Sequence, residues 1–129
     1  MILKEEILKE HSKPHALTIA NYACQPKENF KELMTCFLDE EYRLSQRAAW
    51  SMSWAPKQRP EMIYPHIKDL VSVLHKRNIH DAVIRNSVRV LQGIEIPKRF
   101  HGEIMDACFQ FLEAPQHLLP SRHFLNHFI

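Results

Sequence analysis

The chain has 129 residues, of which 45% are hydrophobic and 25% are charged, and its formal net charge is +2. These proportions exclude wholesale disorder, and the length favours a single domain. A net charge of +2 does not by itself indicate a nucleic-acid-binding protein, although residues 57–101 hold nine Lys/Arg against four Asp/Glu. Only two glycines are present, which disfavours Gly-rich phosphate loops and favours helices joined by proline-marked turns.

The N-terminal stretch MILKEEILKEHSK mixes acidic with apolar residues, unlike a signal peptide or a transit peptide. No apolar run approaches the length that crosses a membrane. The three cysteines, Cys24, Cys36 and Cys108, are embedded in apolar helical patterns, which is typical of reduced, buried thiols. The sequence therefore predicts a soluble cytoplasmic protein that has no membrane partner.

In chain order, hydrophobic periodicity first predicts a short helix that ends before Pro14 and a second helix that ends before Pro26. The clearest stripe follows, because apolar residues recur at the i, i+3, i+4, i+7 and i+8 positions of one helix face. Its members are Phe30, Leu33, Met34, Phe37 and Leu38. The next predicted helix extends from Glu40 to Trp54, and Pro56 closes it.

Further along the chain, Pro65 suits the first turn of a helix. The apolar residues of that helix are Ile67, Leu70, Val71 and Leu74. Asp81 is a predicted N-cap for a helix that continues through Leu91. Beyond Pro97 another helical stripe follows, with Phe100, Ile104, Met105, Cys108, Phe109, Phe111 and Leu112. The remaining tail is apolar but short.

These apolar stripes repeat with a nearly constant period. Phe30, Leu33, Met34 and Phe37 recur 37 residues later as Ile67, Leu70, Val71 and Leu74. QRAAWSM at residues 46–52 corresponds to IRNSVRV at residues 84–90 with an offset of 38, so that Arg47 aligns with Arg85. A helix pair that recurs every 37 to 38 residues indicates an α-solenoid.

The segment DAVIRNSVRVL at residues 81–91 resembles the Asp…Val-Arg segment that leads the second helix of a HEAT unit. The chain as a whole resembles the HEAT and Armadillo repeat families over roughly residues 26–113. This resemblance implies an all-α fold, namely a right-handed α-α superhelix of about three helix pairs. It also implies a scaffold that mediates protein–protein interaction.

The predicted repeat domain comprises residues 1–129. Residues 1–25 form N-terminal cap helices, residues 26–56 the first repeat, residues 60–94 the second, and residues 97–129 a partial third repeat with its tail. The apolar side chains of this tail are expected to pack back on the third unit or to join a homodimer contact. They are Phe124, Leu125, Phe128 and Ile129.

The stretch AAWSMSWAPKQRPEM at residues 48–62 allows two interpretations. From Trp50 to Arg59 it resembles the signature G-S-x-x-M-x-x-K-x-N of the fumarase and adenylosuccinate lyase superfamily, with matches at Ser51 and Lys57. This resemblance implies a lyase-like activity as an alternative function. The favoured interpretation is structural, because the two tryptophans lie one helical turn apart and can bury ring surface against adjoining helices.

No other motif predicts catalytic residues, a cofactor or a metal ion. His11 and His15, like His123 and His127, have the i, i+4 spacing of helical zinc ligands. However, Pro14 lies between the first two, and no acidic motif accompanies either pair. No nucleophile elbow, Walker loop or Ser/His/Asp set is present in the sequence.

Four arginines are the predicted partner-binding residues. Arg43 and Arg47 lie on one predicted helix face, and Arg85 and Arg89 lie on the equivalent face of the next repeat. Because second helices of successive repeats line one surface, these side chains are expected to meet a partner's carboxylates or phosphates. Binding of a nucleic-acid backbone is therefore a second alternative function. The competing interpretation is internal pairing with nearby acids, such as Asp39, Glu40 and Asp81.

Overall fold

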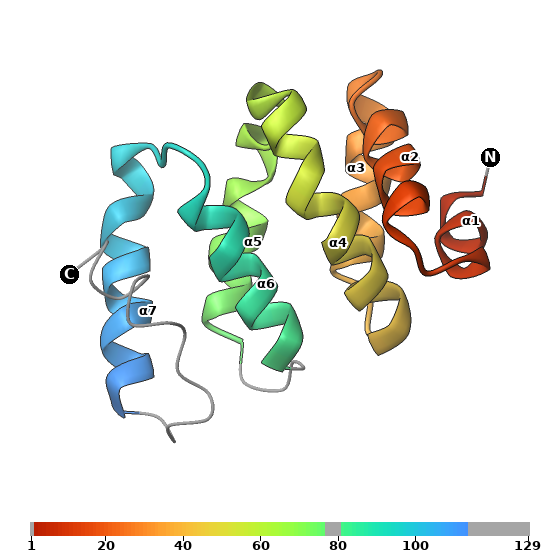
Figure 1. The fold of residues 1–129 in the computed structure, drawn as a ribbon. Coiled ribbons are helices and arrows are strands. Elements are labelled where there is room, and N and C mark those ends of the chain that lie inside the picture. Colours follow the sequence, from red (N-terminus) through yellow and green to blue (C-terminus); the bar gives the residue numbers. More distant parts are fainter. Residues whose placement is uncertain (1, 77–80, 114–129) are drawn as a thin grey trace. The chain divides into compact units, whose positions relative to one another are not determined.

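The structure is a computed structural model, and it describes residues 2–76 and 81–113 (Figure 1). Every regular element in these two ranges is helical, which confirms the predicted all-α fold class. The α-helices are α1 (Leu3–Lys9), α2 (Lys13–Ala23), α3 (Lys27–Phe37), α4 (Tyr42–Gln58), α5 (Ile67–Leu74), α6 (Asp81–Gln92) and α7 (His101–Glu113). The 3-10 turns are η1 (Pro60–Met62), η2 (Tyr64–His66) and η3 (Lys98–Phe100). No helix in the described ranges is long and apolar enough to span a bilayer.

The chain divides between His66 and Ile67 into two compact units. Unit 1 contains α1 to α4, and unit 2 contains α5 to α7. The two helix pairs that the repeat period predicted are both present, since α3 packs against α4 in unit 1 and α5 packs against α6 in unit 2. The repeat boundaries and the hand of the superhelix stay predictions. The apolar tail, with its expected homodimer contact, lies outside the described residues.

Helix α4 is central to unit 1, since it packs against α1, α2 and α3. The predicted stripe on α3 is confirmed at four positions that are at most 2% exposed, Phe30, Leu33, Met34 and Phe37. The buried apolar side chains of α4 that complete this core include Leu44, Ala48, Met52 and Ala55. Burying one large apolar side chain stabilises a fold by roughly 1.5–3 kcal/mol, so this cluster is the main source of stability in unit 1.

Two buried serines of α4 satisfy their hydroxyl groups on neighbouring helices. Ser45 Oγ donates to the Phe37 carbonyl at 2.6 Å, and Ser51 Oγ donates to the Ala16 carbonyl at 3.0 Å. A buried hydroxyl without an acceptor costs free energy. These two bonds therefore allow polar side chains inside the packed interface of α4.

Helix α1 has seven residues, fewer than an isolated helix needs in water. At its N-terminal end, the Glu32 carboxylate accepts a hydrogen bond of 3.2 Å from the Leu3 N–H. At its C-terminal end, the Arg47 guanidinium donates to the Leu8 carbonyl at 2.9 Å. Each charge has the sign that the helix macrodipole favours at that end. Because Leu3 and Ile7 are also buried, α1 is held by α3 and α4 rather than by its own length.

Helix α2 begins at a capped N-terminus. Ser12 Oγ accepts a hydrogen bond of 3.3 Å from the His15 N–H. Pro14 lies in the first turn, where its missing N–H would have no helical partner. The predicted break before Pro14 is confirmed, since α1 ends at Lys9 and the proline lies in the first turn of the next helix.

Helix α4 does not end at Pro56, and this prediction is wrong, because the helix continues to Gln58. Proline removes the hydrogen bond from its own nitrogen and crowds the carbonyl four residues before it, but neighbouring groups hold the last turn in place. The Ala55 carbonyl accepts from the Arg59 N–H at 3.1 Å and from the Cys24 thiol at 3.2 Å. Arg59 Nη1 also donates to the Cys24 carbonyl at 3.0 Å. The end of α2 therefore fixes the end of α4.

In unit 2, α5 packs against both α6 and α7. The predicted stripe on α5 is confirmed at positions that are at most 3% exposed, Ile67, Leu70, Val71 and Leu74. The buried side chains opposite include Val83, Val88, Leu91, Ile104, Ala107, Cys108 and Phe111. Helix α6 spans Asp81 to Gln92, so Asp81 is its first helical residue rather than the N-cap residue that the sequence predicted. The expected capping by the Asp81 side chain lies outside the described residues.

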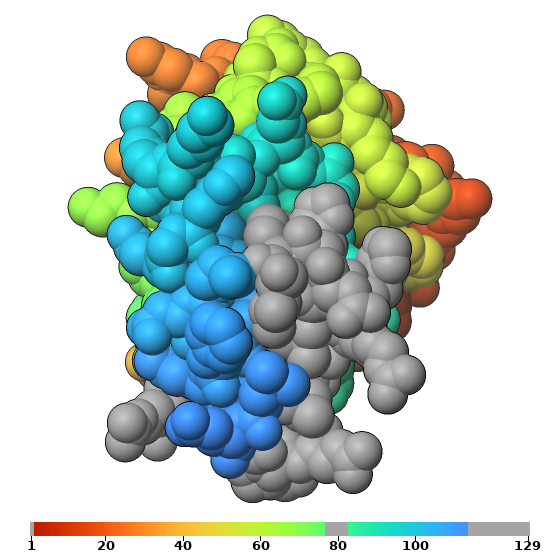
Figure 2. All heavy atoms as spheres, turned by 90° about the vertical axis from the view of Figure 1, so that its left-hand side faces the viewer, coloured from red at the N-terminus to blue at the C-terminus, as the bar shows by residue number. Residues whose placement is uncertain are grey.

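Two members of the stripe predicted on α7 are not part of this core. Phe109 is 51% exposed and Leu112 is 53% exposed, whereas Ile104, Ala107 and Cys108 are fully buried. The helix, drawn in blue, forms much of the face that Figure 2 shows. The sequence-based prediction assigned too many apolar residues to the buried face of α7. A run of adjacent apolar residues extends around the helix and covers more than one face.

Candidate functional site

One face of α4 carries a row of basic and aromatic side chains that we term the α4 stripe, Arg43, Arg47, Trp50, Trp54 and Lys57. Steps of four, three, four and three residues keep all of them on one side of an α-helix. The opposite side of α4 faces the core of unit 1. Helix α4 contains three cations and no acid, although residues 2–66 hold nine Lys/Arg and nine Asp/Glu. Positive charge is therefore concentrated on this helix.

Both tryptophans of the α4 stripe are half-buried, and both rings contact residues in the N-terminal part of unit 1. The Trp50 ring meets His11 edge to face, with centroids 5.2 Å apart and planes at 86°. The Trp54 ring lies beside two ammonium groups, with Lys13 Nζ at 5.3 Å and Lys57 Nζ at 5.1 Å from its centroid. These contacts join α4 to residues 11–13, and a role between two repeats stays a prediction.

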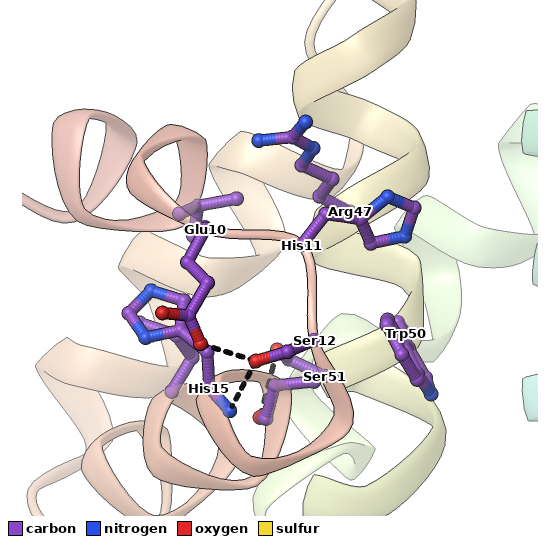
Figure 3. Close-up of a pocket in the computed structure, with 10 residues that line it drawn as sticks. Glu10, His11, Ser12, His15, Arg47, Trp50 and Ser51 are labelled. Atoms are coloured by element: carbon purple, nitrogen blue, oxygen red, sulfur yellow. Dashed lines mark hydrogen bonds between the residues drawn. The ribbon is translucent and has the colours of Figure 1, made fainter.

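Arg47 stands at the rim of a shallow hollow between α4 and the junction of α1 with α2 (Figure 3). The hollow is open to solvent. Buried side chains that line it include Ile7, Ala16, Ile19 and Ser51. Its only carboxylate, from Glu10, accepts a hydrogen bond from the Ser12 hydroxyl. Among the residues described, Arg47 bonds only through Nη1, to the Leu8 carbonyl, so its other N–H donors remain available.

The other three predicted partner-binding arginines are exposed, Arg43 on α4 and the pair Arg85 and Arg89 on α6. Arg43 and Arg47 lie one turn apart in unit 1, as do Arg85 and Arg89 in unit 2. Within each unit, the sequence therefore placed the two arginines correctly on one helix face. Arg47 differs from the others because it also holds α1.

Internal pairing of these arginines is not found in the described ranges, where none lies within 4.0 Å of a carboxylate oxygen. The salt bridges of those ranges are Lys4–Glu41, Lys9–Glu6 and Arg59–Glu61. Asp39 and Glu40, two of the expected acidic partners, are therefore not paired with them. The third, the Asp81 side chain, lies outside the described residues.

The lyase-like stretch is not an open loop. Most of it lies inside α4, and Ser51 is 1% exposed with its hydroxyl bonded to the Ala16 carbonyl. Lys57 lies beside the Trp54 ring. A nucleophile or an acid–base group must reach the substrate, so this geometry gives the signature match no support.

The histidines and cysteines of the described ranges do not form a metal site there, since no group of three His, Cys, Asp or Glu side chains is suitably placed. His15 Nε2 lies 2.7 Å from the Glu6 carbonyl oxygen. The predicted pair His123 and His127 lies outside the described residues. Burial raises the pKa of the Cys24, Cys36 and Cys108 thiols, at Cys36 to about 11, which suits the predicted buried, reduced thiols.

Two features of this surface were missed at the sequence level. The contact of Lys57 with Trp54 could have been predicted from the sequence, because residues three apart on a helix are neighbours. The approach of Lys13 to the same ring depends on how α2 packs on α4, and no local pattern predicts it. The same holds for the bond between Arg47 and the Leu8 carbonyl, which are 39 residues apart.

A family model of the HEAT repeat domain matches residues 3–123, which is nearly the whole chain. No curated protein and no solved structure matches the chain. The match confirms the resemblance that the 37-residue period indicated, and it extends that resemblance to α1 and α2.

Proposed function

The chain belongs to the HEAT repeat family, and on that premise we propose that it is a small helical-repeat scaffold that binds an acidic segment of another protein. The binding groups in this proposal are the predicted arginines Arg43, Arg47, Arg85 and Arg89. HEAT and related repeats commonly use the surface lined by equivalent helices to bind partners. We place the interaction in the cytoplasm, as the sequence predicts.

The observation that carries the proposal is a set of arginines that have no acidic partner among the described side chains. Arg43, Arg85 and Arg89 are exposed and, in the described ranges, make no salt bridge. Elsewhere in unit 1, Lys4, Lys9 and Arg59 each pair with a glutamate. An arginine presents a rigid, bidentate fork that matches a carboxylate. Arginines that form no salt bridge with the described residues are therefore suited to carboxylates of a partner.

The test compares charge reversal at these arginines with charge reversal elsewhere. We expect the double variant Arg43→Glu, Arg85→Glu to lose at least about 90% of a partner that the wild-type chain retains from native extract, because two attractive contacts become repulsive. The matched control is Lys27→Glu with Lys31→Glu, which makes the same charge change at exposed positions of α3. Arg47 is left unchanged because it also holds α1.

Two results would contradict the proposal. One is equal recovery of the partner by the arginine variant and by wild type. The other is a partner that is nucleic acid rather than protein, which a gel shift with steep salt dependence would reveal. Circular dichroism of each variant shows whether the helices remain intact.

A further inference from the structure

Two lysines from different helices share one tryptophan ring in unit 1. Lys13 comes from the first turn of α2, and Lys57 comes from the last turn of α4. Both Nζ atoms lie just over 5 Å from the Trp54 centroid. Each contact is favourable, because an indole face attracts a cation. The two ammonium groups also repel each other, however, and an anion placed between them would relieve that repulsion.

Five acids of unit 1 are engaged with groups other than these two lysines. Glu6, Glu41 and Glu61 form salt bridges with other cations. Glu32 accepts from the Leu3 N–H and from the Tyr22 hydroxyl, and Glu10 accepts from the Ser12 hydroxyl. In the described ranges, no carboxylate forms a salt bridge with Lys13 or Lys57.

A second cationic group, the guanidinium of Arg47, belongs to the same face of α4. Arg47 lies at the rim of the hollow in Figure 3 and, among the described residues, uses only Nη1 in a hydrogen bond, so most of its N–H donors are available. Arg47 and Trp54 are seven residues apart, which is about 10 Å along a helix at 1.5 Å per residue. The α4 stripe therefore carries positive charge near two backbone positions that lie about 10 Å apart along the helix, and the half-buried Trp50 lies between these positions in the sequence.

We infer that the α4 stripe, together with Lys13, binds an acidic segment of a partner protein that presents two carboxylates about 10 Å apart. One carboxylate meets Arg47, and the other lies between the ammonium groups of Lys13 and Lys57. This inference rests on the proposed function and adds to it the spacing of charges in the partner and two lysines as binding residues. Tryptophan and arginine are also the residues most enriched at the energetic centres of interfaces.

The ring contacts favour a peptide over single-stranded nucleic acid. Nucleic acids bind tryptophan by stacking bases on a free ring face. Here Lys13 and Lys57 lie over the Trp54 ring and His11 lies against the Trp50 ring. Carboxylates need only the ammonium and guanidinium groups, which remain accessible.

The experiment uses a preorganised acidic peptide as the probe. The sequence Glu-Pro-Pro-Glu-Pro-Pro-Glu adopts polyproline II, in which every third residue lies on one edge about 9 Å apart. Trp50 and Trp54 are the two tryptophans of the chain, so their emission reports on this surface. We expect saturable quenching of the full chain by this peptide, and at least a fivefold weaker response with Gln-Pro-Pro-Gln-Pro-Pro-Gln.

The decisive variant is Lys13→Gln with Lys57→Gln, which removes both ammonium groups and leaves the exposed positions polar. We expect its affinity for the glutamate peptide to fall at least fivefold, while Lys27→Gln with Lys31→Gln stays within about twofold of wild type, because electrostatic attraction falls off beyond the Debye length. Circular dichroism verifies that both variants keep their helices. Equal binding by the two variants would overturn the inference, as would tighter binding of oligothymidylate than of the peptide.

This experiment separates the inference from the proposed function. If the Lys13 and Lys57 variant binds the peptide like wild type while reversal of Arg43 and Arg85 still removes the partner, only the inference fails. If the lysine variant loses the peptide but the arginine variant retains its partner, only the proposed function of the arginines fails.

Discussion

Helix α4 of unit 1 and helix α6 of unit 2 occupy equivalent positions in the repeat period, yet their arginines have different contacts. Arg47 is half-buried and donates to the carbonyl of Leu8, whereas Arg85, which aligns with it, is exposed. The difference comes from the neighbours, because α4 packs against α1 and α2 as well as α3. An arginine at one repeat position can therefore hold the fold in one unit and remain available to a ligand in the other.

Buried serines show the same contrast. Ser51 in α4 is fully buried and bonds to the Ala16 carbonyl of α2. Ser87 in α6 is equally buried, but in the described ranges its hydroxyl has no hydrogen-bond partner. Since α2 supplies the acceptor for Ser51, the additional helices of unit 1 change the energetic role of polar residues as well as of charges.

The largest expected effect tests whether unit 1 has a core of its own. Phe37 is fully buried, and Phe37→Ala should destabilise unit 1 by about 3–5 kcal/mol, because it removes a large side chain and leaves a cavity. Urea unfolding followed by tryptophan emission measures this loss, since both tryptophans lie in unit 1. The exposed Phe109 of unit 2 provides the control, and Phe109→Ala should leave the emission transition within about 0.5 kcal/mol of wild type.

The next effect concerns pH and contrasts two buried thiols. Burial, Glu32 and Asp39 raise the pKa of the Cys36 thiol from 9.0 to about 11, whereas burial alone raises the pKa of Cys108. Between pH 9 and pH 11 the unfolded chain has lost the Cys36 proton that the folded chain retains, so stability falls as pH rises. We expect a loss on the order of 2 kcal/mol in unit 1 across this window.

Urea unfolding at pH 8 to 11 measures that loss, and Cys36→Ala should flatten the slope for unit 1 relative to wild type. Cys108→Ala should leave the emission-detected slope unchanged, because this thiol belongs to unit 2. An unchanged slope in Cys36→Ala would show that other groups cause the alkaline loss of stability.

Arg47 and Arg85 provide the direct test of the difference between the two helices. Arg47→Ala should destabilise unit 1 by about 1–2 kcal/mol, because the Leu8 carbonyl loses a charged donor at a helix C-terminus. Arg85→Ala removes an exposed side chain and should change stability by no more than about 0.5 kcal/mol. Urea unfolding by far-UV circular dichroism measures both variants, and equal losses would contradict the assigned roles.

The smallest expected effect is a difference between two serine-to-alanine substitutions in the sign of the stability change. Ser51→Ala should cost about 1 kcal/mol, since it removes a buried hydrogen bond. Ser87→Ala should be neutral or slightly stabilising, because it removes a buried hydroxyl that has no acceptor in the described ranges. Thermal unfolding of the two variants beside wild type resolves the difference, and a clear loss in Ser87→Ala would mean that this hydroxyl has a partner in solution.

Local periodicity was sufficient to predict the helices and their buried faces. The stripes from Phe30 to Phe37 and from Ile67 to Leu74 are confirmed, because a 3.6-residue period reports directly on the face that packs. Pro56 was interpreted as a helix end from its own chemistry, while the contacts that extend α4 come from Cys24 and Arg59. Errors therefore occur where a distant residue decides the local structure.

The candidate site was predictable to a similar extent. Arg43 and Arg47 were placed correctly on one face of α4, because four residues make about one turn. Their surroundings could not be predicted, since the Lys13 contact with Trp54 and the Leu8 contact with Arg47 depend on tertiary packing. Sequence therefore located the basic helix face, and the structure added the residues that surround it.

The brief helix α1 has one further consequence for this surface. Its helical state depends on Glu32 and Arg47 at its two ends and on the burial of Leu3 and Ile7. Because α1 has only seven residues, we expect its local unfolding to require less free energy than global unfolding of unit 1. Each opening of α1 frees the whole guanidinium of Arg47 and removes Ile7 from the wall of the neighbouring hollow. The rate at which α1 amides exchange with deuterium thus measures how often this arginine is fully accessible to a ligand.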